Sequence, residues 1–171
     1  MAPDILQMLA EGDRKEVARS GDVAVAAAES PETLALVVAA LFHDEPAVVS
    51  HAAHALMTVA KKNAPLLNPH REALARAYGE EQWELKEQMA KILPQLSFRE
   101  SEQGRLMEEF DATLRTHKSG IARTCALQAM VDIAAQNNAH AAMARQGLDY
   151  AQGHTSKALQ ARARKLGPLL D

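Results

Sequence analysis

Aromatic side chains, cysteine and long apolar runs are all scarce in this chain of 171 residues. Phe, Trp and Tyr make up 4% of it, and runs rich in Val, Ile, Thr and aromatics, which are typical of strands, are nearly absent. The single Cys125 excludes a disulfide within one chain and agrees with a reducing compartment. The longest apolar stretch, Leu34–Phe42, has nine residues and is far too short to span a bilayer.

The N-terminal residues Met1–Asp4 lack a basic segment leading into an apolar stretch, so they do not resemble a secretory signal. We therefore expect a soluble cytoplasmic protein. Ala and Leu dominate the 47% of residues that are apolar. Because Ala is the best helix former and lets helices approach closely, the composition predicts an all-α fold, and the length fits one domain.

Charge is distributed unevenly along the chain. The net charge of −3 combines −8 over residues 1–114 with +5 over residues 115–171. Such an asymmetry can steer an acidic partner to one end of the molecule or favour head-to-tail self-association. Drift of solvated surface charge is the favoured interpretation.

Punctuating residues divide the chain into helices. Asp13 and Ser30 are the expected N-caps, and Pro31 and Pro46 are expected at first helical positions. Most glycines and the other prolines fall in or near the breaks. We predict ten helices, at residues 4–11, 14–28, 31–43, 46–62, 68–78, 81–96, 101–116, 119–136, 138–151 and 155–170.

An apolar stripe recurs on every second helix at a period of 36–37 residues, and nineteen of its twenty positions are apolar. Such a recurrence is the signature of a repeat protein, in which no unit buries its apolar face alone. The stripe consists of Val49, Ala53, Leu56, Met57 and Ala60, then Leu85, Met89, Ile92, Leu93 and Leu96, then Ala122, Ala126, Ala129, Met130 and Ile133, and finally Leu159, Ala163, Leu166, Gly167 and Leu170.

The segment Asp44–Leu56 resembles the second helix of a HEAT repeat, and the stretches Trp83–Leu96, Gly120–Ala134 and Lys157–Leu170 resemble later copies. The resemblance covers residues 31–171. It implies an α-α superhelix, the armadillo-like solenoid of HEAT proteins, built as a right-handed stack of about five helix pairs in one domain over residues 1–171. The implied units are a degenerate N-terminal capping pair at residues 1–30 and repeats at 31–67, 68–100, 101–137 and 138–171.

HEAT repeats also carry an acidic residue before the second helix and a Lys or Arg six positions later, which pair along the stack. In this chain those positions hold Asp44 and Ser50, Glu80 and Lys86, His117 and Arg123, and His154 and Gln160. Only the pair of Glu80 and Lys86 is complete, although Glu80 is also placed to pair with Arg123 of the next repeat. We therefore expect the charge ladder to be mostly broken.

The resemblance implies that the second helices line the concave face of the stack. Counting 100° per residue, the side of these helices opposite the apolar stripe carries mixed polar residues with no long run of one charge sign. We predict a partner-binding surface there. Its candidate residues, which lie next to Ala55 and Leu127, are His51, His54, Glu87, Lys91, Thr124, Gln128, Arg164 and Lys165.

Seven histidines and one cysteine raise the question of chemistry. Zinc requires about four ligands in tetrahedral geometry, and although His43, His51 and His54 are close in sequence, they have no Cys companion and form no His-Glu-x-x-His motif. Cys125 adjoins a core position and is expected to pack rather than react. Trp83 is expected to seal a junction between repeats, the alternative being an anchor for a partner. We expect no catalytic residue, metal site or cofactor.

A basic cluster on the last helix leaves nucleic-acid binding open, although binders usually present a larger basic stripe. The alkylpurine DNA glycosylases share the HEAT-like architecture and use an Asp, an Arg and aromatic residues in a concave cleft. This chain has no Asp at the inferred concave positions, and Tyr78 and Tyr150 are expected on outer helices, so this activity is disfavoured. The cluster comprises Lys157, Arg162, Arg164 and Lys165.

The sequence therefore favours a non-catalytic HEAT-repeat scaffold or adaptor whose concave surface binds a protein partner, with no membrane contact. The alternative is a nucleic-acid-associated protein that uses the basic C-terminal third. The sequence specifies neither the identity of the partner nor an oligomeric state.

Overall fold

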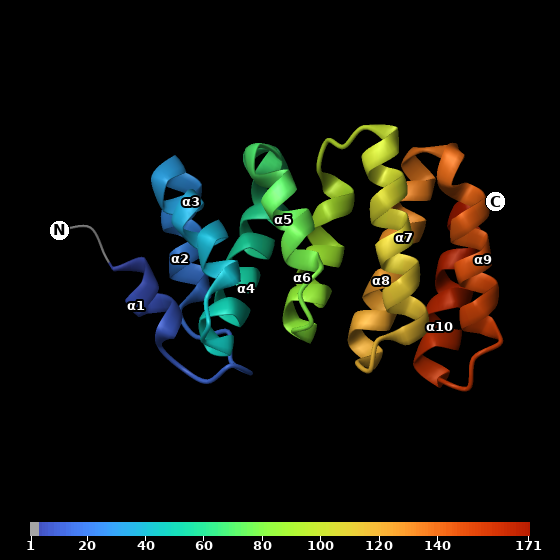
Figure 1. The fold of residues 1–171 in the computed structure, drawn as a ribbon, viewed down its shortest axis with the longest axis horizontal. Coiled ribbons are helices and arrows are strands. Elements are labelled where there is room, and N and C mark those ends of the chain that lie inside the picture. The colour runs from blue at the N-terminus through green and yellow to red at the C-terminus, as the bar shows by residue number, and fades with distance from the viewer. Residues whose placement is uncertain (1–3) are drawn as a thin grey trace. The chain divides into compact units, whose positions relative to one another are not determined.

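The computed structural model describes residues 4–171, and every regular element in this range is helical (Figure 1). Short 3₁₀ turns extend α3, α6 and α10 and precede α5 and α9. The all-α prediction is confirmed. The helices are α1 (Ile5–Ala10), α2 (Ser20–Glu29), α3 (Pro31–Ala39), α4 (Pro46–Asn63), α5 (Arg71–Tyr78), α6 (Trp83–Ile92), α7 (Glu100–Thr116), α8 (Gly120–Gln136), α9 (Ala141–Gln152) and α10 (Lys157–Leu166).

Residues 1–3, which belong to the predicted capping pair and to the stretch compared with a secretory signal, lie outside the described residues. Between residues 4 and 171, no helix combines the length and the apolar character needed to cross a membrane.

Local capping signals place most helix starts where the sequence predicts them. The Ser30 hydroxyl accepts a hydrogen bond from a backbone N–H in the first turn of α3, which Pro31 opens. Pro46 opens α4 in the same manner. Ser119 and Ser156 cap α8 and α10 through their side chains. These helices therefore start where a side chain accepts a bond from a free backbone N–H, or where proline has no N–H that needs a partner.

The prediction of a helix at residues 14–28 is wrong at its start, because α2 begins at Ser20 and residues 11–19 form a loop. Asp13, expected to cap this helix, accepts a hydrogen bond from the N–H of Lys15 inside the loop. Side chains of α4 contact the backbone carbonyls of Asp13 and Arg14. A helix through these residues would need the same carbonyls for its own hydrogen bonds, so the two arrangements compete.

The repeating apolar stripe lies in the core. Eighteen of its twenty positions are buried, and the other two, Gly167 and Leu170 near the end of the chain, are partly exposed. Ala53, Ala126 and Ala163 on the stripe have no solvent exposure. Small buried side chains of this kind let neighbouring helices approach closely.

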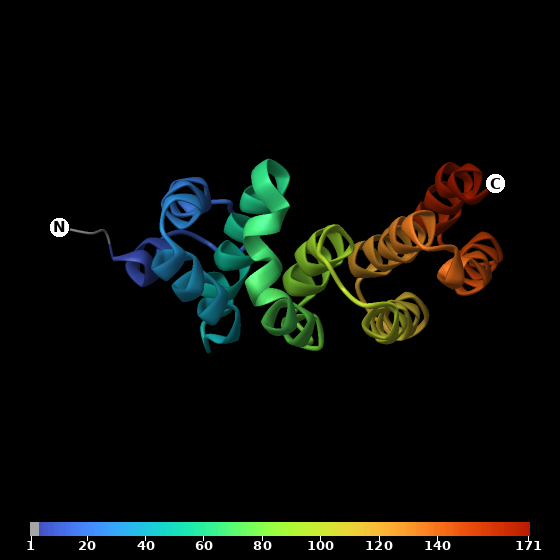
Figure 2. The same ribbon diagram turned by 90° about the horizontal axis from the view of Figure 1, so that it is seen from above.

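The chain forms two compact units, residues 1–97 and residues 98–171, here called the first and second unit. In the first unit, α2 packs on α3 and α4, α4 and α5 pack on α6, and α1 lies on α4. In the second unit, α8 packs on α7, α9 and α10, and Figure 2 shows α7 and α9 in one layer and α8 and α10 in the other. The helices are thus packed in pairs within each unit, while the single-domain arrangement stays a prediction.

A close approach inside the second unit holds α9 against α7 and α8. A Cβ atom built on Gly147 of α9 would lie 3.2 Å from Cε of Met130 and 3.3 Å from Cδ2 of Leu114. Contacts this short require the neighbouring side chains to shift, because packed interiors leave few voids. Glycine at position 147 therefore sets the spacing between these helices.

Candidate partner-binding surface

His51 is not on the surface. It has no solvent exposure, and its Nδ1 and Nε2 atoms lie 2.7 Å and 2.9 Å from the carbonyl oxygens of Leu9 and Asp13. The expectation of an accessible His51 is therefore wrong. The side chain does point away from the apolar stripe, but the segment from α1 through the loop at residues 11–19 covers it. A neutral imidazole donates to one of these carbonyls, and a doubly protonated ring donates to both.

The same segment covers Ser50 and Glu84. The Ser50 hydroxyl, which is fully buried, donates to the carbonyl oxygen of Arg14 at 3.0 Å. The Arg14 guanidinium makes two bonds to the Glu84 carboxylate, with nitrogen to oxygen distances of 2.5 Å and 2.8 Å, and Glu84 is only 3% exposed. Burial alone would raise the pKa of Glu84, but hydrogen bonds from Arg14 and from the backbone outweigh it and hold this pKa below its ordinary value.

The remaining candidates of the first unit stand at the edge of this covered region. His54 is half-buried, and burial lowers the pKa of its imidazole, an effect that the nearby Glu87 carboxylate partly opposes. Glu87 and Lys91, one turn apart on α6, form an ion pair of 2.8 Å. This part of the surface offers one paired charge of each sign and one imidazole that burial keeps mostly neutral.

In the second unit, the candidates Thr124 and Gln128 belong to a polar row along α8. The Thr124 hydroxyl bonds to backbone carbonyls of its own helix. Gln128 donates to the Asp132 carboxylate at 2.9 Å and accepts from the Arg162 guanidinium at 3.0 Å. Burial raises the pKa of Asp132 above its ordinary value, against the opposing effects of Gln128 and Arg162. This cluster links α8 to α10.

Arg164 and Lys165 on α10 are exposed, as the sequence predicts. Leu127, expected beside the candidate surface, is fully buried instead. Helix α8 is enclosed by three other helices, so a residue on the flank of its apolar stripe still lies in the core.

Three residues that build these sites are missing from the sequence prediction: Arg14, Glu84 and Asp132. Asp132 follows Gln128 by four residues and Thr124 by eight, so helical spacing alone places it on the same side of α8. Helical spacing therefore places Asp132 among the inferred concave positions, contrary to the prediction that none of these positions is an Asp. The pairing of Arg14 with Glu84 spans 70 residues and has no local signal.

The positions of the expected charge ladder have a different role, which is to donate to backbone carbonyls. Lys86 donates to the carbonyl oxygen of Tyr78 at the end of α5 at 2.8 Å. Arg123 donates to that of Leu114 in the last turn of α7 at 2.7 Å. In the C-terminal part of a helix such carbonyls lack intrahelical partners, and a cation there also meets the negative end of the helix dipole. These two side chains therefore stabilise the preceding helix of their own pair.

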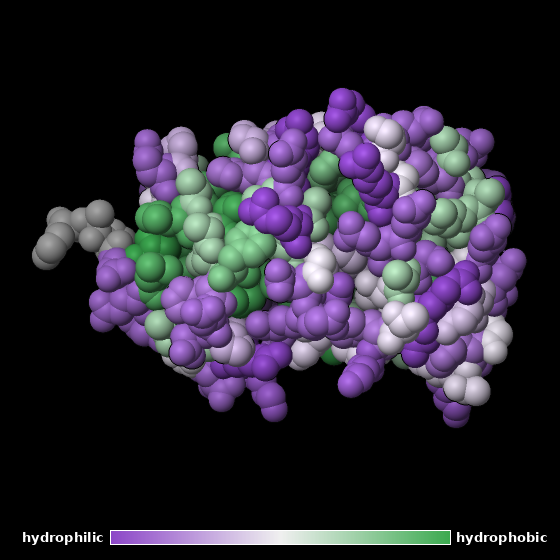
Figure 3. Space-filling view, viewed as in Figure 1, coloured by the Kyte–Doolittle hydropathy of each residue, from purple (hydrophilic) through white to green (hydrophobic). Residues whose placement is uncertain are grey.

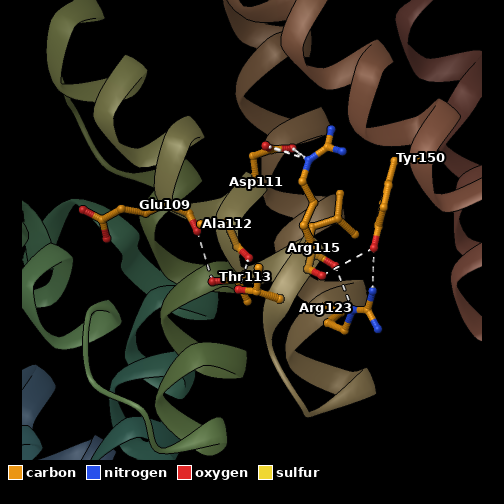
Figure 4. Close-up of polar contacts among 9 residues, drawn as sticks. Glu109, Asp111, Ala112, Thr113, Arg115, Arg123 and Tyr150 are labelled. Carbon is orange, nitrogen blue, oxygen red and sulfur yellow. Dashed lines mark hydrogen bonds and ion pairs between the residues drawn. The ribbon is translucent and has the colours of Figure 1, made fainter. Parts of the chain in front are cut away.

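A polar junction of α7, α8 and α9 surrounds Tyr150 (Figure 4). Its hydroxyl accepts a hydrogen bond from Arg123 at 3.0 Å, and the guanidinium of Arg115 lies 4.6 Å from the centre of its ring. Arg115 in turn bonds Asp111 one turn earlier on α7, at 2.9 Å. Tyr78 and Tyr150, expected on outer helices, lie on α5 and α9.

Three histidines occupy equivalent turns before a second helix. Nδ1 of His43 accepts the backbone N–H of Glu45 ahead of α4, at 3.0 Å. His117 and His154 form the same bond ahead of α8 and α10, at 3.0 Å and 2.9 Å. These bonds explain three of the seven histidines as turn-forming residues. Within residues 4–171, no group of three or more His, Cys, Asp or Glu side chains is arranged to hold a metal ion.

The first unit also exposes apolar surface over its N-terminal helices, visible in Figure 3. Leu6, Val25 and Leu36, on α1, α2 and α3, are each about half exposed, at 45–52%. A hollow of about 310 Å³ in the same unit is lined by His70 and by apolar side chains of α2, of α3 and of residues 64–70. Cys125, by contrast, is buried, as expected of a packing residue.

Comparisons of this chain with models of protein families, with curated proteins and with solved structures find no match.

Proposed function

We propose that the chain is a HEAT-type α-solenoid, a right-handed stack of helix pairs, and that it acts as a non-catalytic scaffold whose second helices present a surface to a protein partner. The observation that carries the proposal is the order of helix contacts. In the first unit α2, α4 and α6 pack successively, and in the second unit α8 packs on α10. Stacking of every second helix is what a period of 36–37 residues requires if each pair buries its stripe against the next.

The chemistry of the candidate surface supports binding rather than catalysis. Its charged and polar side chains bond to one another: Glu87 bonds Lys91, and Gln128 joins Asp132 to Arg162. A catalytic acid or base needs a position within reach of a substrate in a cavity. Paired groups of mixed sign on neighbouring helices suit the polar rim of a protein interface.

Affinity purification of the full chain with identification of bound proteins tests this function. The variants are Glu87→Lys and the double substitution of Arg164 and Lys165 by Glu, and the control is Arg105→Glu on α7. We expect at least one surface variant to lose a partner that the wild type and the control both retain. If the three variants and the wild type all return the same proteins, or none, the scaffold proposal fails.

A nucleic-acid-associated function is the second candidate, and it depends on the exposure of Lys157, Arg164 and Lys165 on α10. Binding through phosphate contacts weakens steeply with salt. Retention of the chain on single-stranded or duplex DNA or on RNA at 50 mM salt that is lost at 200 mM salt, and lost in the Arg164 and Lys165 double variant, would favour it. No retention at the lower salt concentration removes this candidate.

A further inference from the structure

The loop at residues 11–19 is held to the body of the first unit by polar contacts. Its apolar side chains Val17 and Ala18 are exposed, with Val17 at 58%. Its backbone is strained at Ala18, a non-glycine residue with a φ angle of 45°, whereas Gly12 adopts its φ angle of 91° without strain. Because the loop buries no apolar side chain and carries strain at Ala18, its polar contacts supply most of what holds it closed.

Beneath this segment lie three polar side chains that each recognise a peptide feature. Nε2 of His51 and the Ser50 hydroxyl bond the main-chain carbonyls of Asp13 and Arg14 in the turn after α1, while Nδ1 of His51 bonds the carbonyl of Leu9 in α1 itself. Glu84 binds the Arg14 guanidinium through two parallel hydrogen bonds, a geometry that an arginine side chain supplies and a lysine does not. Because the pKa of Glu84 is held low, this carboxylate stays charged at neutral pH.

The charge of the first unit also suits a basic ligand. Residues 1–97 contain nine Lys and Arg against fourteen Asp and Glu. Glu87, one turn beyond Glu84 on α6, is partly exposed and is paired with Lys91. An arginine-bearing segment is therefore attracted to this face before it makes any specific contact.

We infer that the Ser50 hydroxyl, Nε2 of His51 and the Glu84 carboxylate form a binding site for an arginine-bearing peptide segment, and that the chain's own Asp13 and Arg14 occupy this site. A partner segment binds when the loop at residues 11–19 swings away, and its arginine replaces Arg14 on Glu84. The inference rests on the proposed scaffold function and names the class of partner and the residues that read it.

Competition between the loop and a free peptide tests this assignment. The probe is a fluorescently labelled peptide with the sequence of residues 8–16, titrated into the full chain and followed by anisotropy. In the variant Arg14→Ala the site loses its internal arginine while α1 keeps its buried residues. We expect this variant to bind the peptide about tenfold more tightly than the wild type, as for removal of an internal competitor worth about 1.4 kcal/mol.

Two controls test whether Glu84 binds the arginine of the peptide. A peptide in which the residue equivalent to Arg14 is Ala should not show the tenfold gain in affinity. The chain variant that combines Arg14→Ala with Glu84→Gln should not show it either. Lys15→Ala, which removes an exposed cation of the same loop, should bind as the wild type does. Circular dichroism checks folding, and Arg14→Lys, which keeps the charge but not the paired hydrogen bonds, replaces Arg14→Ala if that variant is unfolded.

Equal binding by wild type and Arg14→Ala, or no binding by either at millimolar peptide, overturns the inference. The titration requires no cellular partner, so this failure leaves the scaffold proposal standing on its other residues. The opposite outcome is also distinguishable. If the peptide binds as expected but no purified partner depends on the surface residues, the scaffold function is removed and the peptide site remains.

Discussion

The two units differ in what lies over their second helices. In the first unit, α1 and the following loop cover Ser50, His51 and Glu84, and the exposed candidates are confined to the margin. In the second unit, the polar row on α8 and the basic residues of α10 are bonded to each other or exposed, without a covering segment of their own unit. One repeated helix pattern thus serves two purposes, a site that the chain fills itself and a surface that it leaves open.

The largest expected effect comes from the cores of the two units. Leu56 and Phe110, in the first and second unit, are both fully buried, so Leu56→Ala and Phe110→Ala should each cost about 2–5 kcal/mol of unfolding free energy. For a single solenoid domain we expect each substitution to shift one shared urea transition, seen alike by circular dichroism and by the fluorescence of Trp83. Two separate transitions, with Phe110→Ala leaving the Trp83 signal in place, would show independent domains.

The next largest effect is expected from breaking the ion pair between Arg14 and Glu84, which holds the covering loop on the first unit. Arg14→Ala leaves the Glu84 carboxylate buried without its main partner, so we expect a loss of about 1–3 kcal/mol. Adding Glu84→Gln should return part of this loss, because the unpaired charge is removed. A double-mutant cycle by urea denaturation measures the coupling. A coupling near zero would mean that the loop does not hold this geometry in solution.

A matched effect is expected in the second unit. Arg123→Ala removes the hydrogen bonds to the Leu114 carbonyl and to Tyr150 that join three helices, which should cost about 1–2 kcal/mol. Arg164→Ala on the exposed side of α10 should change stability by less than about 0.5 kcal/mol. Thermal melts of both variants provide the measurement, and equal melting temperatures would contradict a structural role for Arg123.

The smallest effect concerns Asp132. Its raised pKa means that the native state keeps the proton at a pH where the unfolded chain has lost it. The associated stabilisation is complete below the unfolded pKa, near 3.8, and is lost as pH rises through the folded pKa. Asp132→Asn cannot ionise, so at neutral pH it should be more stable than the wild type by up to about 1 kcal/mol, with the difference vanishing toward pH 4. Lower stability of the variant at pH 7 would show that attraction to Arg162 outweighs the cost of burial.

Local chemistry accounts for the parts of the fold that the sequence predicts well. Apolar spacing predicted the buried stripe, since its residues recur every three or four positions on successive helices, and Ser30, Pro31 and Pro46 marked helix starts. The start of α2 was beyond reach, because the carbonyls that would continue that helix toward the N-terminus are taken by Ser50 and His51 from about 40 residues away.

Burial of the candidate surface residues likewise depends on contacts between segments that are distant in the sequence. A helical wheel predicts the direction of a side chain relative to its own helix, and for His51 that direction is right. Burial depends on whichever segment crosses that side of the helix, and in this chain it is the loop before α2. Asp132, by contrast, was within reach of helical spacing, because its neighbours Gln128 and Thr124 lie on the same helix.

The histidine turns provide markers of folding that NMR spectroscopy can detect. Because Nδ1 of His43 and of His117 accepts a backbone N–H, each of these neutral rings carries its proton on Nε2. Nitrogen NMR distinguishes this tautomer from the mixture present in an unstructured chain. His43 reports the α3 and α4 pair, and His117 reports the α7 and α8 pair. The order in which these two signals disappear on denaturation would record which of the two pairs unfolds first.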